Sequence, residues 1–359
     1  MTDPPDSPVT DSASRPMTHP GTSRARNFSP WASWMLQLAE VEAEDPLVTD
    51  DAASFAAWRD RCRARLDALL GSPPRAVDLA LETTEVVACE GYRRERIVFD
   101  VEATMSVPAY LLVPDGRAHP GSAVLAVHGH GPGKDVVVGL AETDAPNGDY
   151  ARQLVRRGHV VLAPDLRCFG ERLDWNPPDH YACDTNLVHA VMAGASPLTQ
   201  NLWDLSRCLD VLAGHELVDP ARLGVAGLSY GGTMALFLAA TDERVSAAVV
   251  SGYLSSWAEA HKMPWNMCGS QVLPGMLGRL EHEDLGALVA PRPLLVETGR
   301  DDDLFPLPAA QHTVAHLREV YAMLDAPEAL AHDVFDGGHQ WHGTLALDFL
   351  DTHLGIGSS

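Results

Sequence analysis

Apolar residues in the first part of the chain that we expect to be ordered recur every three or four positions. The pattern runs from residue 28 to residue 75, with tryptophan, phenylalanine and leucine at the repeating positions. This spacing places the apolar side chains on one face of an α-helix. Gly71 and the pair Pro73-Pro74, residues that end helices, close the pattern. The sequence therefore predicts an N-terminal segment, residues 28–75, of one or two amphipathic helices that pack on the core.

After this segment the apolar residues occur in short runs. The first three runs alternate polar and β-branched residues, as antiparallel strands do, and a turn at Pro114-Asp115-Gly116 follows them. The later runs are wholly apolar and are separated by helical patterns, which is typical of a parallel sheet buried on both faces. We expect strands at 82–89, 94–101, 105–113, 123–127, 160–163, 223–226, 245–250, 293–297 and 331–335, and helices at 150–157, 202–214, 231–240, 309–324 and 341–354.

The predicted fold is therefore α/β, with a mostly parallel central sheet and helices on both faces, in one domain over residues 76–356. Two stretches, at about 168–199 and 252–285, interrupt the alternation of strands and helices. Both follow the carboxyl ends of strands, where open α/β sheets place their ligand sites. We expect them to line or cover a substrate pocket; the alternative is two surface excursions that close over the core. Their large apolar residues are Trp175, Tyr181, Met192, Tyr253, Trp257, Met263, Trp265 and Met267.

The charge balance limits the classes of partner. Lys and Arg total 26 against 49 for Asp and Glu, a formal net charge of -23. Nucleic acids and anionic membranes need a basic surface, so we expect neither as a partner. No run of about 18 apolar residues is present, so no membrane-spanning helix is expected. Residues 1–27, rich in Pro, Ser, Thr and Asp, predict a disordered tail without a signal peptide and hence a cytoplasmic location.

The six cysteines show neither the CxxC spacing of a metal site nor the density of a disulfide framework. We expect free thiols, most of them buried as small apolar side chains. They are Cys62, Cys89, Cys168, Cys183, Cys208 and Cys268.

The clearest candidate for chemistry is Ser229, in Gly227-Leu228-Ser229-Tyr230-Gly231. A predicted strand leads into this pentapeptide and a predicted helix leaves it. In that context G-x-S-x-G forms a tight turn that displays the serine hydroxyl above the sheet, beside the positive end of the helix. Side chains at Gly227 and Gly231 would collide with neighbouring elements. We therefore expect Ser229 to be a nucleophile.

A serine nucleophile needs a base, and His339 is the best placed of the 16 histidines. It follows the last predicted strand in Asp336-Gly337-Gly338-His339, where the glycines let a loop present the ring. His332 and His342 are rivals, but we place the first in the strand and the second in the final helix.

The third member should be a carboxylate after the preceding strand, which fixes the histidine tautomer and stabilises the imidazolium. That loop contains three successive aspartates. Asp302 has the expected register between Gly299 and Pro306, with Asp301 and Asp303 as alternatives. Glu297, inside the predicted strand, is more readily explained as a structural residue.

Acyl transfer also needs N–H donors for the developing oxyanion. The backbone N–H of Tyr230, next to the nucleophile, is one candidate. The second is the N–H of His130 in His128-Gly129-His130-Gly131, with that of Gly129 as the next choice. No carboxylate pair lies near the two histidines, so we expect no metal. Lys134 lies at the wrong spacing for a phosphate-binding loop.

With these elements in order, the sequence resembles the α/β-hydrolase superfamily over about residues 80–355. It is most similar to the dienelactone-hydrolase-like and acetyl-xylan-esterase-like branch of bacterial carboxylesterases. Further segments that carry this resemblance are 165–172, 218–222 and 290–295. It implies a Ser-His-Asp triad, an acyl-enzyme intermediate and hydrolysis of carboxylic esters, short-acyl or acetyl, without a cofactor. True dienelactone hydrolases have cysteine where this chain has Ser229, which argues against their substrate.

Other readings of the same residues stay open. The site could hydrolyse amides or peptides, transfer an acyl group to an alcohol or amine, or cleave a C–C bond. A non-catalytic binding protein on a hydrolase scaffold is the alternative from another class. The expected partner is a small-molecule ester, and the apolar N-terminal helices leave a homo-oligomer open. No motif specifies the substrate.

Overall fold

The computed structural model describes residues 27–141, 147–175, 181–262 and 266–356. The chain divides into a short unit, residues 1–42, and a large unit, residues 43–359. The described part of the short unit contains helix α1, Pro30–Ala39, whose first turn is capped by the Ser29 hydroxyl accepting from the Ala32 N–H at 3.2 Å. The disordered tail predicted for residues 1–27 lies, except for residue 27, outside the described residues.

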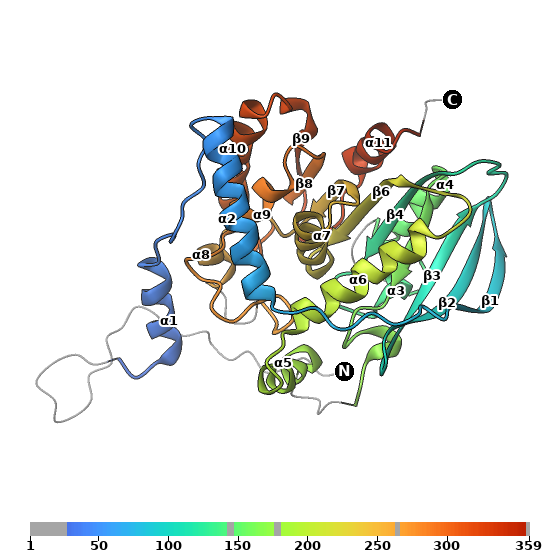
Figure 1. Ribbon diagram of the computed structural model, residues 1–359, viewed down its shortest axis with the longest axis horizontal. Helices are drawn as coiled ribbons and strands as arrows, with labels where there is room; N and C mark the ends of the chain where they lie inside the picture. The colour runs from blue at the N-terminus through green and yellow to red at the C-terminus, as the bar shows by residue number, and fades with distance from the viewer. Residues whose placement is uncertain (1–26, 142–146, 176–180, 263–265, 357–359) are drawn as a thin grey trace, which may run out of the picture. The chain divides into compact units, whose positions relative to one another are not determined.

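The large unit begins with helix α2, Ala52–Leu70 (Figure 1). The Asp51 carboxylate caps it by accepting from two N–H groups of the first turn, and Gly71, with φ of 74°, ends it. One face of the helix, made by Phe55, Trp58, Cys62 and Leu66, lies in the main hydrophobic core. Regular helical spacing predicted one or two helices between residues 28 and 75, and the structure contains two, α1 and α2.

A nine-stranded sheet forms the centre of the large unit, in the order β1-β2-β3-β5-β4-β6-β7-β8-β9. The pairs from β1 to β5 along this order are antiparallel, and all pairs from β5 to β9 are parallel. The predicted mostly parallel α/β sheet is confirmed. The strands are β1 Glu82–Cys89, β2 Tyr92–Glu102, β3 Met105–Pro114, β4 Gly121–Val127, β5 Val160–Pro164, β6 Val218–Leu228, β7 Val245–Ser251, β8 Leu294–Gly299 and β9 Leu330–Phe335.

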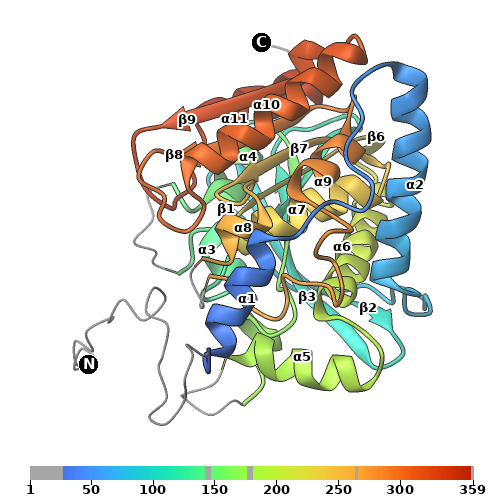
Figure 2. The same cartoon turned by 90° about the vertical axis from the view of Figure 1, so that its left-hand side faces the viewer.

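Two hydrophobic clusters cover the two faces of the sheet. Along β4 successive side chains belong to different clusters, Leu125 to one and Val124 and Ala126 to the other, because neighbouring strand residues point to opposite faces. One cluster includes residues of α2, α6 (Pro197–Ala213), α7 (Tyr230–Thr241), α9 (His282–Val289) and α10 (Leu307–Met323). The other includes residues of α3 (Lys134–Val137), α4 (Tyr150–Arg156) and α11 (Thr344–His353) (Figures 1 and 2).

Helix boundaries differ from the prediction at two places that affect the site. Helix α6 starts at Pro197 rather than at 202, because Ser196 caps it and proline suits the first turn. Helix α11 starts at Thr344 rather than at 341, because Gly343 is left-handed with φ of 79°. His342 therefore lies in the loop after β9, and its placement in the final helix was wrong.

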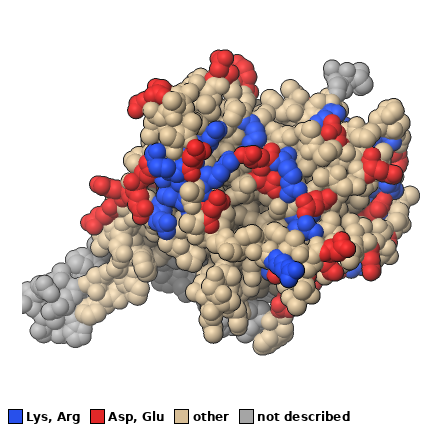
Figure 3. All heavy atoms as spheres, viewed as in Figure 1, with Lys and Arg blue, Asp and Glu red and all other residues tan. Residues whose placement is uncertain are grey.

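The two predicted excursions carry short helices, α5 (Ala182–Met192) and α8 (Trp257–Ala260). On the face shown in Figure 3, basic and acidic side chains of the described residues are interspersed. Ion pairs among the described residues include Arg61 with Asp45 at 2.9 Å. Within the described part of the chain, every helix is too short or too polar to cross a lipid bilayer.

Candidate active site

Ser229 occupies the sharp turn between β6 and α7. Its φ of 60° and ψ of -119° lie in a region that few non-glycine residues adopt. The turn is fixed on both sides: the Ser229 N–H donates to the Ser251 carbonyl at 2.9 Å, and its carbonyl accepts from the Thr233 N–H at 2.9 Å. The strained backbone is thus held by the neighbouring strand and by the helix that follows.

The glycines on either side of Ser229 are required by close backbone contacts. A Cβ at Gly227 would lie 2.2 Å from the Gly231 carbonyl oxygen. A Cβ at Gly231 would lie 2.0 Å from the carbonyl oxygen of Val127, at the end of β4. Both distances are far below van der Waals contact, so this local geometry accepts only glycine.

His339 and Asp302 lie together beside the turn. His339 Nδ1 is 2.9 Å from Asp302 Oδ2, and the Asp302 side chain is 1% exposed. The second oxygen of Asp302 accepts from the N–H groups of Leu304 and Phe305 at 2.9 and 3.0 Å. His339 Nε2 has no hydrogen-bond partner among the described residues. The histidine is therefore oriented through one nitrogen while the other remains available to a reacting group.

The two flanking aspartates have no such contact. Asp301 and Asp303 are exposed, whereas Asp302 is buried. The Asp301 N–H donates to the Gly337 carbonyl at 3.0 Å, and this bond ties the aspartate loop to the loop that carries His339. Of the three candidates, the structure brings only Asp302 to the histidine.

Glu297, which we expected to be structural, is hydrogen-bonded to the backbone of the loop after β9, the loop that carries His339. Its carboxylate is fully buried in β8 and accepts from the N–H groups of His342 at 3.4 Å and Gly343 at 2.8 Å. Burial raises the pKa of Glu297 to about 7.

The two rival histidines have other partners. His342 contacts Asp333 through Nδ1 at 2.7 Å. His332 lies in β9, as predicted, with Nε2 3.1 Å from the Thr298 hydroxyl. Neither rival histidine approaches the site.

The loop after β4 lies against the serine turn. A Cβ at Gly129 would be 3.3 Å from Ser229 Cβ, which shows how closely this backbone approaches. His128 is buried, with Nδ1 2.6 Å from the Gly129 carbonyl and Nε2 accepting from the Leu166 N–H at 3.0 Å. Burial lowers the pKa of His128 to about 4, so the ring is neutral at pH 7 and fastens the loop.

A buried ion pair anchors the end of the same loop, and sequence reasoning missed it. Lys134 Nζ is 2.6 Å from Asp165 Oδ2 and 2.6 Å from Glu171 Oε1. The Lys134 N–H also donates to Asp165 at 2.8 Å. Burial by itself would lower the pKa of Lys134, but the hydrogen bonds that its ammonium donates to the two carboxylates raise it above its usual value. The only sequence signal was that Lys134 is one of two lysines in the chain.

A cavity of about 720 Å³, a usual size for a small-molecule site, lies at the serine turn. Its lining includes Ser229, His339 and, from the loop after β4, His128, Gly129, His130, Pro132 and Gly133. The predicted excursions supply Tyr181, Met267 and others, so they do line the pocket in part. Of the other aromatic candidates, Trp175 is exposed, Tyr253 and Trp257 are buried in the core, and 263–265 lie outside the described residues.

Comparisons with known proteins agree with this architecture. The model of the Abhydrolase family matches residues 38–332. A Bacillus subtilis (strain 168) protein named "Putative hydrolase YtaP" is 27% identical over 270 residues, 72% of this chain and 87% of that protein. Among solved structures, a "putative acetyl xylan esterase" of Bacteroides fragilis NCTC 9343 has a TM-score of 0.73 at 20% identity, with 88% of this chain and 84% of that chain covered. The glucuronoyl esterase of Solibacter usitatus has a TM-score of 0.66 at 16% identity, with 88% and 100% covered. The two structures show the shared fold.

Proposed function

The chain belongs to the Abhydrolase family, and on that premise we propose that it hydrolyses carboxylic esters with Ser229 as nucleophile, His339 as base and Asp302 as the orienting acid. One observation carries the proposal. His339 is held by Asp302 through Nδ1, keeps Nε2 without a partner among the described residues, and shares a cavity with Ser229. That arrangement is what a general base needs in order to take a proton from a serine hydroxyl.

In the first half-reaction, Ser229 Oγ attacks the ester carbonyl and its proton passes to His339 Nε2. The developing oxyanion accepts from the N–H of Tyr230 and that of His130, or of its neighbour Gly129. Tyr230 is the first residue of α7, so the helix itself offers no acceptor for its N–H. The alcohol then leaves with the proton from His339, and an acyl-Ser229 ester remains.

In the second half-reaction, water attacks the acyl-enzyme and gives a proton to His339. The same two N–H groups stabilise the second oxyanion, and the carboxylic acid departs as Ser229 recovers its proton. In both half-reactions Asp302 accepts hydrogen bonds from His339, Leu304 and Phe305 and stabilises the imidazolium.

The cavity supports a neutral ester with a small acyl group. Its described lining contains no Lys or Arg, so nothing there would pair with an anionic acyl group. His128, Leu228 and Phe305 line the cavity together with Ser229. The names of the similar structures, acetyl xylan esterase and glucuronoyl esterase, point to esters of carbohydrates as the first substrates to try.

The test is the hydrolysis of p-nitrophenyl acetate together with labelling by a fluorophosphonate. We expect Ser229→Ala to abolish both and to keep the far-ultraviolet circular dichroism of the wild type. Ser246→Ala is the matched control. The Ser246 hydroxyl donates to the Ala221 carbonyl at 2.9 Å, and Ser246 does not line the cavity. Wild-type turnover by Ser229→Ala, or a label on another residue, would disprove the proposal. Product analysis with a competing alcohol or amine separates hydrolysis from acyl transfer.

A further inference from the structure

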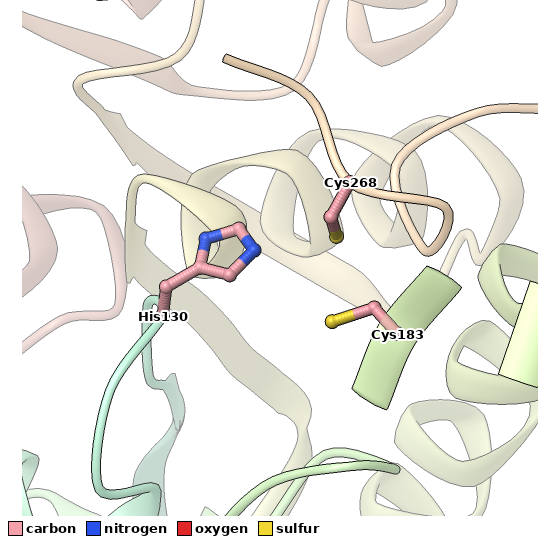
Figure 4. Close-up of side chains that lie close together, drawn as sticks. All are labelled: His130, Cys183 and Cys268. Carbon is pink, nitrogen blue, oxygen red and sulfur yellow. The ribbon is translucent and has the colours of Figure 1, made fainter. Parts of the chain in front are cut away.

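Three side chains with no part in the proposed ester chemistry lie together at the wall of the cavity. They are His130, from the loop after β4, Cys183, in the first turn of α5, and Cys268, from the second excursion. Figure 4 shows the imidazole and the two sulfurs pointing into a common space. The candidate ligand atoms all lie within 4.8 Å of one another. Three segments far apart in the sequence thus present one nitrogen and two sulfurs to the same point.

The donor set and its spacing suit a zinc ion. Zinc bonds of about 2.3 Å to sulfur and about 2.0–2.1 Å to nitrogen place tetrahedral donors roughly 3.5–4 Å apart. The upper limit of 4.8 Å on the separations of the three ligand atoms is close to this geometry. Thiolate and imidazole are the ligands that zinc prefers, and two cysteines with one histidine leave a fourth position open.

The surrounding structure holds the three ligands in place without a metal. The His130 ring lies against Tyr230 and Phe169, with centroid distances of 5.2 and 5.5 Å. Asp184, next to Cys183, accepts from the Gly269 N–H at 2.7 Å, and this bond joins the two excursions beside the sulfurs. Such fixed partners reduce the entropy lost when a metal binds.

We propose that His130, Cys183 and Cys268 bind Zn²⁺, with the fourth coordination position facing the cavity. His130 and Cys268 both line that cavity, so a water or a ligand atom can reach the ion. The ion would tie both excursions to the loop that supplies an oxyanion donor. The site goes beyond the proposed ester hydrolysis and is not required by it, because Ser229, His339 and Asp302 are complete without a metal.

A second group of potential ligands in the described residues, Glu297, Asp333 and His342, does not support a similar proposal. Its donors are engaged in holding the loop after β9: Glu297 accepts from two backbone N–H groups, and Asp333 contacts His342. A metal there would have to replace these bonds.

The test measures zinc directly. The full chain, reduced with a phosphine and freed of metal with a chelator, is incubated with ZnCl₂, desalted and analysed by inductively coupled plasma mass spectrometry. We expect one Zn²⁺ per chain for the wild type and for Cys89→Ser, a half-buried thiol on β1. We expect Cys183→Ser and Cys268→Ser to bind at least tenfold more weakly. Equal uptake by the wild type and the double variant Cys183→Ser/Cys268→Ser would overturn the proposal.

A second measurement uses only the wild-type chain, so it holds even if a variant fails to fold. Iodoacetamide labelling, mapped by mass spectrometry, should modify Cys183 and Cys268 at least tenfold more slowly with ZnCl₂ than without it, while Cys89 is unaffected. Replacing zinc with Co²⁺ should give the near-ultraviolet absorption of thiolate-to-cobalt charge transfer. Equal labelling rates, or a Cys183–Cys268 disulfide that forms in excess ZnCl₂, would refute the site.

Discussion

Asp302 bonds to His339 with one carboxylate oxygen, 2.9 Å from Nδ1, while its other oxygen accepts the N–H groups of Leu304 and Phe305. The Asp302 carboxylate is thus held by its own loop as well as by the histidine. Its neighbours Asp301 and Asp303 are exposed and lack this backing. Burial and hydrogen bonding, more than position in the sequence, distinguish Asp302 from the two aspartates beside it.

This difference predicts the outcome of two matched substitutions. Asp302→Asn should lower kcat by about 10³–10⁴, because the amide favours the wrong histidine tautomer and cannot stabilise the imidazolium. Asp301→Asn should stay within about twofold of the wild type, as surface substitutions outside a site usually do. Steady-state hydrolysis of p-nitrophenyl acetate measures both. Equal losses in the two variants would show that Asp302 is not the acid of the triad.

Gly252 gives room to the imidazole. A Cβ there would lie 3.1 Å from Cε1 and Nδ1 of His339, and its φ is 56°. Gly252→Ala should therefore displace the ring and lower kcat at least tenfold, because small misplacements of catalytic groups are costly. Gly275→Ala is the control: its φ is 74°, yet nothing lies within 4 Å of an added Cβ. Both variants incur a backbone cost of about 1–2 kcal/mol. If both keep full kcat, the ring does not depend on Gly252.

Lys134 should be essential for stability. Its side chain is 2% exposed, and its ammonium pairs with Asp165 and Glu171. Lys134→Met removes the cation and leaves the buried Asp165 charge uncompensated, a loss of about 3–5 kcal/mol in the free energy of unfolding. Lys262→Met is the control, because that side chain is 62% exposed and should cost less than about 0.5 kcal/mol. Urea denaturation compares them, and a loss in Lys134→Met no greater than in the control would contradict this role.

The raised pKa of Glu297 predicts that the stability of the folded chain depends on pH. Burial raises its pKa to about 7 in the folded chain, above its usual value of 4.5. The folded state holds the proton more tightly than the unfolded state, so this contribution is complete below about pH 4.5 and is lost as the pH rises toward 7. Glu297→Gln lacks the titration. The variant's free energy of unfolding minus that of the wild type should therefore increase by about 2–3 kcal/mol from pH 5 to pH 8, because only the wild type loses stability through this group.

Urea unfolding of both proteins at the two pH values measures this change. Taking the difference between variant and wild type cancels the titration of other buried carboxyls, such as Glu281 and Asp284, which also have raised pKa values. A difference that stays constant with pH would mean that Glu297 is not protonated in the folded chain near neutrality.

The sequence by itself determined the features that depend on neighbours along the chain. Alternating and wholly apolar runs predicted the strands, because the burial of a strand's two faces follows directly from the order of apolar and polar residues along it. The turn at Ser229 was predicted because its glycines, its strand and its helix are adjacent in the sequence. His339 was chosen as the candidate base for the same reason, since the last strand and two glycines precede it directly.

Only the tertiary structure decided the features made by contacts between distant segments. The choice of Asp302 depends on how the loop after β8 folds against the loop of His339, where Asp301 bonds to Gly337. The meeting of His130 with Cys183 and Cys268 depends on where two excursions close over the sheet. No spacing rule relates these residues, because the chain between them is folded by packing and not by local periodicity. The expectation of free thiols, most of them buried, is confirmed, but no spacing in the sequence indicated that Cys183 and Cys268 lie near each other and near His130.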